Sequence, residues 1–159
     1  AYGEDMTRKI VEELRNQNVL VISGLAYGID AFAHKYAVEN NVSTIGVLAH
    51  GLDRLYPQKN KALARKMLDN GGLLTEFFSG TNPDRENFPK RNRIVAGMAD
   101  ATILVEATAK GGSLITANIA NSYSREVFAV PGRSIDLYSQ GCNQLIKSNR
   151  AALIESGKD

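Results

Sequence analysis

The sequence predicts an α/β protein of the extended Rossmann-like type, with a doubly wound, mostly parallel sheet and helices on both faces. Short apolar runs alternate along the chain with amphipathic or charged segments of helical length. The connections between these runs are long enough for the crossovers that parallel strands require. The chain has 159 residues, 43% of them hydrophobic, so we expect one domain with one sizeable core over residues 1–159.

The first half of the chain contains three predicted helix-and-strand pairs. Residues 7–16 place three aliphatic side chains on one helical face, and residues 19–22 form the continuous apolar run typical of a buried parallel strand. Residues 30–40 repeat small and aromatic residues at helical spacing. The other expected elements are a strand at 44–48, a charged helix at 59–68 and a strand at 73–76.

The second half continues the same alternation. Pro89 fits the first turn of a helix, where its missing N–H costs nothing, and residues 94–98 carry that helix into the core. The remaining expected elements are a strand at 101–105, a helix at 114–123, a strand at 127–130, a short helix at 143–147 and a strand at 152–154. In such sheets ligands bind beyond the carboxyl ends of the strands.

Composition limits the possible functions. The net charge is only +2, so binding to a polyanion would depend on local clusters of cations. The one cysteine, Cys142, excludes an intrachain disulfide and is expected to be a small buried residue, and with only two histidines a zinc site is not expected. No leader-like segment or apolar run of about 18 residues occurs, so we expect a cytoplasmic protein without a membrane span.

Three segments after predicted strands favour anion binding. Residues 87–93 combine three cations with Phe88 at a helix start, where free N–H groups attract phosphate. Residues 23–30 and 106–116 each place glycines and a serine before a helix. The alternatives are a solvated basic helix start with Phe88 as its hydrophobic staple, and a tight turn capped by Asp30. The spacing of a dinucleotide-binding fingerprint is absent.

A catalytic site is not required by the sequence. Asp30 and His34 share a helix face, but Asp30 is explained as a cap, and His50 after a strand is a candidate ligand contact. Glu76 and Glu106 end strands, where a carboxylate could act as a base. No nucleophile elbow or metal-binding cluster is present.

Five motifs together resemble the DNA-processing protein A family, also called DprA or Smf. The motifs are Ser23–Asp30 with Ala33-His34, Gly51–Asp53 with Tyr56-Pro57, Phe88–Ile94, Gly112–Ala117 and Val127–Gly132. The resemblance implies a domain that binds single-stranded DNA without base specificity, forms dimers on it and helps load the RecA recombinase during natural transformation. It implies no cofactor, no metal and no catalytic turnover.

The residue chemistry and the resemblance together indicate which residues contact DNA. Phosphate contacts are expected from Arg85, Lys90, Arg91 and Arg93, from the amides around Ser23 and Gly24, and from Gly112 and Ser113. Phe88 is the expected stacking platform, and Tyr27 is a second aromatic near the rim formed by the carboxyl ends of the strands. Residues 141–154 are a candidate dimer interface. Family members also carry a strand with an arginine loop just before the position of Tyr2, and flanking small domains, which this sequence lacks.

Two other functions remain open at this stage. One is a nucleotide hydrolase of the lysine-decarboxylase-like, cytokinin-activating type, for which residues 131–134 are the nearest glycine loop, although they lack its run of glycines. The other is an interaction module whose basic rim docks an acidic protein such as the recombinase.

Overall fold

The computed structural model describes all 159 residues and confirms every predicted helix and strand. In the first half the elements are α1 (Tyr2–Leu14), β1 (Leu20–Ser23), α2 (Ile29–Glu39), β2 (Ser43–Val47), α3 (Lys61–Met67) and β3 (Gly71–Leu74). In the second half they are α4 (Asn87–Met98), β4 (Ala101–Leu104), α5 (Gly112–Ser122), β5 (Glu126–Ala129), α6 (Gln140–Lys147) and β6 (Ala152–Leu153). None of the helices combines the length and the hydropathy that crossing a lipid bilayer requires.

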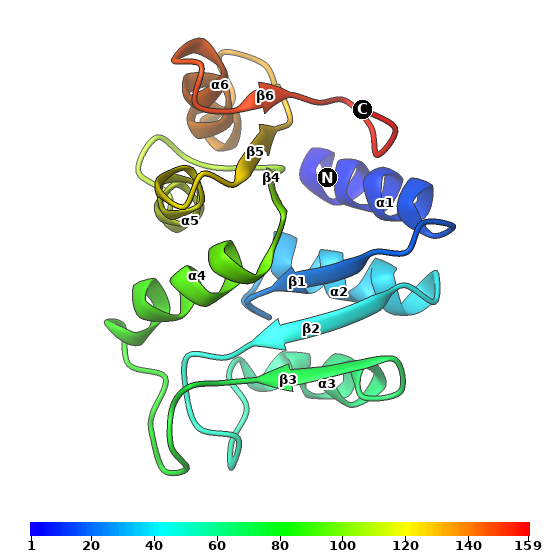
Figure 1. The fold of residues 1–159 in the computed structure, drawn as a ribbon, viewed down its shortest axis with the longest axis vertical. Coiled ribbons are helices and arrows are strands. Elements are labelled where there is room, and N and C mark those ends of the chain that lie inside the picture. The colour runs from blue at the N-terminus through cyan, green and yellow to red at the C-terminus, as the bar shows by residue number, and fades with distance from the viewer.

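All strand pairs are parallel, as predicted, but the strands form two sheets. One sheet has the order β1-β2-β3 and the other has the order β4-β5-β6 (Figure 1). β1 and β4 are the inner strands, and no ladder joins them. Parallel strands are normally buried on both faces, yet Leu20 on β1 is 45% exposed and Ile103 on β4 is 37% exposed. The expected continuous sheet is therefore interrupted at its centre.

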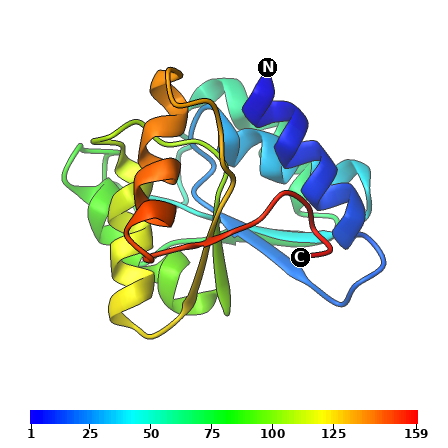
Figure 2. The same cartoon turned by 90° about the horizontal axis from the view of Figure 1, so that it is seen from above.

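The helices cover both faces of the strands. α1, α2 and α3 lie on one side, and α4, α5 and α6 lie on the other (Figure 2). α1 spans the interruption, because Val11 packs with Tyr36 of α2 while the neighbouring Ile10 packs with Val105 and Val130 behind the second sheet. The two sheets are thus held as one domain by helices rather than by a shared strand ladder.

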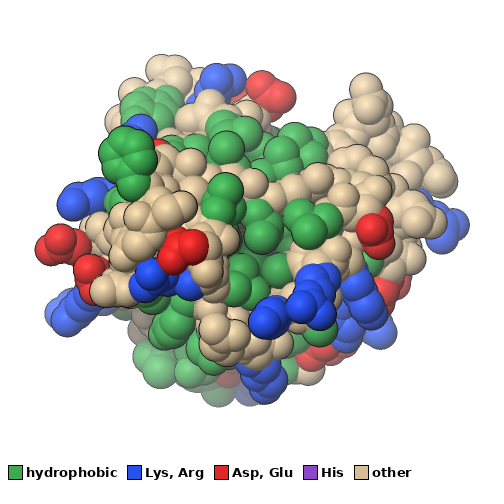
Figure 3. All heavy atoms as spheres, turned by 90° about the horizontal axis from the view of Figure 1, so that it is seen from below, with side chains coloured by type: hydrophobic (Ala, Val, Ile, Leu, Met, Phe, Trp, Pro, Cys, Tyr) green, Lys and Arg blue, Asp and Glu red, His purple; other side chains and the backbone are tan.

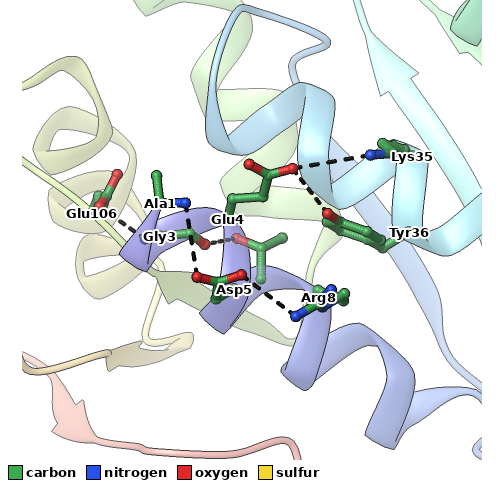
Figure 4. A network of polar contacts seen from close by, with 9 residues as sticks. Ala1, Gly3, Glu4, Asp5, Arg8, Lys35, Tyr36 and Glu106 are labelled. Atoms are coloured by element: carbon green, nitrogen blue, oxygen red, sulfur yellow. Dashed lines mark hydrogen bonds and ion pairs between the residues drawn. The ribbon is translucent and has the colours of Figure 1, made fainter.

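The N-terminus of α1 is held to both halves of the chain through two carboxylates, Glu106 after β4 and Glu4 of α1 itself (Figure 4). The Gly3 N–H donates to Oε1 of Glu106, which follows β4, at 3.0 Å. On the other side, the Tyr36 hydroxyl donates to Oε1 of Glu4 at 3.0 Å, and Lys35 pairs with the same oxygen. Glu106 satisfies an amide that a free helix end would leave unpaired. This long-range contact explains why α1 begins five residues before the start that its sequence predicts.

The larger hydrophobic core lies between the second sheet and α4, α5 and α6. Cys142 is fully buried in it, as predicted, and its Sγ lies 3.6 Å from the Leu104 carbonyl oxygen. Burial, with a smaller contribution from the charge of Glu106, raises the pKa of this thiol to about 11. The thiol therefore has the properties of a packing residue.

β3 leaves one edge of the first sheet unpaired. On this side of the molecule, hydrophobic side chains are exposed across the middle of the face and cations gather beside them (Figure 3). Leu68 and Leu74 are among the exposed apolar residues here, and Lys61, Arg65 and Lys66 on α3 form no ion pair. Positive charge beside an open edge opposes strand pairing between molecules.

Candidate nucleic-acid interface

A hollow of about 330 Å³ lies at the carboxyl ends of β1 and β2. The glycine loop after β1, two loop segments after β2 and the first turn of α4 meet there. Its lining residues are Gly24, Ala26, Tyr27, Ala49, His50, Tyr56, Pro57, Phe88 and Arg91. We call it the aromatic pocket. Four of the residues predicted to contact DNA therefore come together at one site: Gly24, Tyr27, Phe88 and Arg91.

Arg91 departs from its predicted position, because it does not project into solvent. The side chain is only 4% exposed, and its Nη1 donates to the carbonyl oxygen of Gly24 at 2.6 Å and also to that of Val47. Its Nε donates to Oδ1 of Asn92 at 3.0 Å. Arg91 shares one helix face with Asn87 and Ala96, which are also buried, so the helical period turns it inward. It ties α4 to the ends of β1 and β2.

The Arg91 guanidinium nevertheless has capacity for an anion. No carboxylate lies within salt-bridge distance, and Nη2 has no hydrogen-bond partner. Burial lowers the pKa of Arg91, and the nearby charge of Asp30 partly opposes this shift. A buried cation without a carboxylate partner is costly, so a negative group entering the aromatic pocket would gain a strong interaction.

Aromatic rings form the wall above Arg91. The centroids of the Tyr56 and Phe88 rings lie 6.2 Å apart with an interplanar angle of 68°, an edge-to-face arrangement. The Arg91 Cζ lies 5.7 Å from the Phe88 ring centroid, within cation–π range. Tyr27 stands at the rim and is 62% exposed. Phe88 is half-buried, so one part of its ring remains available to a planar ligand.

The glycine loop between β1 and α2 is shaped by Asp30. Asp30 does not cap α2, because the N-cap position belongs to Gly28. Its carboxylate instead accepts hydrogen bonds from the Ser23 hydroxyl at 2.6 Å and from the Ala26 N–H at 3.1 Å. The hydroxyl of Ser23 and the amide of Ala26 are thereby occupied. Leu25, between them, is fully buried with a left-handed backbone (φ 58°), which few residues other than glycine adopt.

Gly24 is required where Arg91 approaches the loop. A Cβ at this position would lie 2.6 Å from the guanidinium carbon and nitrogens of Arg91. Any side chain would therefore displace the arginine from the two carbonyl oxygens that it joins. The absence of a side chain at Gly24 lets Arg91 of α4 approach the loop closely.

Both histidines are buried and hold backbone or core groups. The His34 Nδ1 lies 2.7 Å from the Thr44 hydroxyl, and burial lowers the pKa of His34 to about 4, so the ring is neutral at pH 7. His50 Nε2 accepts from the Tyr56 N–H at 3.1 Å, which leaves the proton on Nδ1, 2.9 Å from the Gly51 carbonyl oxygen. His50 lines the aromatic pocket with its ring while both nitrogens shape the loop.

The other predicted cations differ in their surroundings. Arg93 pairs with Glu76, whereas Lys90 is exposed and forms no ion pair. Lys90 and Arg93 line a second hollow of about 420 Å³ with Glu76, Phe77, Phe78 and Thr81. Arg85 is exposed, is not paired with either flanking acid, and lines neither hollow.

Gly112 and Ser113 are exposed at the N-terminus of α5. A Cβ at Gly97, near the end of α4, would lie 3.4 Å from the Tyr123 ring at the end of α5. α4 and α5 therefore run in the same direction, and their N-termini lie at the same edge of the molecule. The two residues line neither hollow.

The groups that a hydrolase would use have structural partners. Glu76 pairs with Arg93, and Glu106 accepts the Gly3 N–H. In the loop of residues 131–134, Gly132 exchanges two hydrogen bonds with the Asn143 side chain, at 3.1 and 2.9 Å. The Gly132 N–H is therefore occupied by a side chain.

Two site residues were missed by sequence reasoning. Tyr56 belongs to a motif that carried the family resemblance, but no role was assigned to it. Phe78 follows β3 in a loop without helical or strand periodicity, so no sequence pattern marked it as a binding residue.

The chain matches the profile of the family described as DNA recombination-mediator protein A over residues 1–159. It is 41% identical to the DNA processing protein DprA of Streptococcus pneumoniae over 157 residues, and 40% identical to Protein Smf of Synechocystis, also over 157 residues. The chain belongs to the DNA recombination-mediator protein A family.

The solved structures of this family share the fold. The X-ray structure of DprA from Streptococcus pneumoniae superposes with a TM-score of 0.90 at 40% identity, over 98% of this chain and 54% of that one. DprA from Helicobacter pylori, described for its unique single-stranded DNA binding mode, gives a TM-score of 0.90 at 29% identity, over 99% of this chain and 71% of that one.

The chain corresponds to only part of its longer family members. It matches 55% of the length of the pneumococcal protein and 39% of the Synechocystis protein. In both cases the match covers 99% of this chain.

Proposed function

We propose that this chain binds single-stranded DNA without base specificity and without altering it chemically. The observation that carries the proposal is the aromatic pocket, in which a buried guanidinium without a carboxylate partner lies beneath the Phe88 and Tyr56 rings. A nucleotide offers the two matching groups, a planar base and an anionic phosphate. The single-stranded DNA binding named for the Helicobacter pylori relative supports the same ligand.

The DNA strand is bound by base stacking and by ionic contacts with its phosphates. A base stacks on Phe88, where such contacts contribute about 1–3 kcal/mol each, with Tyr56 and Tyr27 beside it. An adjacent phosphate reaches the free Nη2 of Arg91, and Lys90 holds the next phosphate on the outer side of α4.

Further phosphates follow the same edge of the molecule. Arg85 is an unpaired exposed cation, and the amides at Gly24 and at the start of α5, Gly112 and Ser113, offer N–H groups. The Ser23 hydroxyl is a weaker candidate because it already donates to Asp30. Arg93 binds a phosphate once it is released from Glu76. That ion pair is exposed and contributes little net free energy.

The lack of base specificity follows from the polar groups in the aromatic pocket. Both nitrogens of His50 are engaged by backbone groups, and Arg91 is suited to anions. Few side chains remain to read the edge of a base, whereas every base offers a face for stacking.

The interruption between β1 and β4 accommodates one further strand. Both inner strands have a free edge, and Leu20 and Ile103 are uncovered there. A strand inserted at this place would join the two sheets in the order of a continuous doubly wound fold, and its end would lie beside the aromatic pocket.

Protection of incoming DNA and loading of the RecA recombinase form the biological part of the proposal. The proposal includes a dimer formed through residues 141–154, because β6 has a free outer edge and Leu153 is exposed. A two-fold axis along such an edge would pair identical segments.

Fluorescence anisotropy with labelled oligonucleotides tests the proposal. We expect oligothymidine and mixed-sequence single strands to bind with similar affinity and the matching duplex to bind more weakly. The logarithm of the affinity should fall with the logarithm of the salt concentration by about 0.7 per phosphate contact. Failure to bind any oligonucleotide at low salt, with recombinase binding intact, would instead support a protein-docking module. Release of bases from nucleoside monophosphates would support the hydrolase.

A further inference from the structure

Phe78 is the most exposed large hydrophobic side chain of the molecule, at 89%. Exposing a whole phenyl ring to water forgoes the free energy that its burial would provide. Its exposure is confined to the side chain, because the Phe78 carbonyl oxygen accepts the Thr81 N–H at 3.1 Å and lies 2.5 Å from where a Gly51 Cβ would stand.

The loop that presents Phe78 is fixed to the loop that follows β2. The Thr75 hydroxyl donates to the His50 carbonyl oxygen at 2.8 Å, and the Gly51 N–H donates to the Thr81 carbonyl oxygen at 3.1 Å. The Gly80 N–H donates to Oδ1 of Asp53 at 2.8 Å, and this bond is the main cause of the lowered pKa of Asp53. Because His50 also lines the aromatic pocket, one rigid unit carries both Phe78 and a wall of that pocket.

The second hollow, beside Phe78, contains one cation that has no acidic partner. It is lined by Phe78 together with Lys90 and the mutually neutralising pair of Glu76 and Arg93. Lys90 is thus its one cation without an acidic partner. Lys90 stands two residues after Phe88 on the first turn of α4, so the two side chains point to different faces of the helix, Phe88 toward the aromatic pocket and Lys90 toward the second hollow.

We propose that Phe78 is a second base-stacking platform for the same DNA strand. This inference rests on the proposed function and adds a neighbouring subsite to it. Phe88 stacks one base in the aromatic pocket, Phe78 stacks a later base in the second hollow, and Lys90 binds a phosphate between them. A solvent-exposed ring held on a rigid loop loses little conformational entropy when a base stacks on it.

The surroundings of Phe78 favour a nucleotide over a hydrophobic protein partner. A protein interface would need a contiguous apolar patch, whereas Phe78 is followed by the exposed Ser79 and Gly80 and shares the hollow with Lys90. Phe77, which also lines the hollow, is half-buried, so Phe78 offers the exposed ring beside a free cation, as the alternation of bases and phosphates in a single strand requires.

Substitution of Phe78 tests this inference on the whole chain, with oligothymidine as the probe. Phe78→Ala should weaken binding about tenfold, within the range that loss of one stacked base gives, and should leave the salt slope unchanged. Phe78→Trp should bind as tightly as the parent or more tightly. Leu68→Ala is the matched control, because Leu68 is also exposed (58%) but lies at the end of α3, where β3 begins, and it should bind like the parent.

An oligonucleotide with abasic sites separates stacking from indirect effects. If Phe78 stacks a base, Phe78→Ala should cost much less affinity for a fully abasic strand than for oligothymidine. An equal loss for both strands would overturn the stacking role. Full affinity of Phe78→Ala, with weakened binding by Phe88→Ala, would overturn the second platform and leave the proposed function intact. Absence of oligothymidine binding by the parent chain would instead reject the proposed function itself.

Discussion

Arg91→Ala is expected to lower the free energy of unfolding by about 2–4 kcal/mol and to remove most of the affinity for single-stranded DNA. The substitution leaves three oxygen acceptors without their donor, two of them main-chain carbonyls at the ends of β1 and β2. It also removes the one cation at the base of the aromatic pocket. Arg91→Lys should recover only part of the stability, because an ammonium group does not reproduce the fixed fork of a guanidinium.

Urea unfolding followed by circular dichroism measures this effect. The matched control is Arg93→Ala, which removes an arginine two residues further along α4 whose only partner is the partly exposed Glu76. Exposed ion pairs contribute at most about 1 kcal/mol, so this variant should unfold close to the parent. Equal stability losses in the two variants, or none in Arg91→Ala, would contradict the structural role assigned to Arg91.

Phe88→Ala is expected to weaken single-strand binding by a factor of about 10 to 100, because it removes the central stacking surface of the aromatic pocket. The edge-to-face contact with Tyr56 and the cation–π contact with Arg91 are lost together with the ring. The salt dependence should stay that of the parent, since no charge changes. Phe88→Tyr should retain most of the affinity.

Anisotropy titrations at two salt concentrations check this prediction, with circular dichroism to confirm that the variant is folded. A change in the salt slope without a change in affinity at low salt would mean that Phe88 acts through the cations around it. Parent-like affinity for Phe88→Ala would remove the aromatic pocket from the binding surface.

The fold could be predicted from the sequence because its elements are locally encoded. The run that became β1 is apolar and β-branched, and α1 before it carries a clear amphipathic pattern. The start of α1 could not be predicted, because Glu106 satisfies its first turn from about a hundred residues away. The interruption between the two sheets likewise depends on which strands meet, and strand pairing is not a local property.

The candidate site was predicted in its location but only partly in its geometry. Placing ligand residues at the ends of strands correctly brought Gly24, Tyr27 and Phe88 to one pocket. Charge alone suggested that Arg91 and Arg93 are exposed phosphate contacts, whereas helical period turns Arg91 inward.

The other roles that could not be predicted belong to residues in loops or beside them. The roles of Asp30 and His50 depend on hydrogen bonds to backbone groups, whose positions are set by tertiary packing. Tyr56 and Phe78 lie in loops where no periodic pattern distinguishes a binding residue from a connecting one.

Photocrosslinking of a 5-iodouracil-substituted single strand, followed by mass spectrometry of the digested complex, tests the central claim most directly. The account predicts that the strand crosslinks to peptides containing Phe88, Tyr56 or Tyr27 at the rim of the aromatic pocket. Crosslinks confined to the opposite edge of the molecule, at the amino ends of the strands, such as residues 15–19, 68–71 or 124–126, would contradict it.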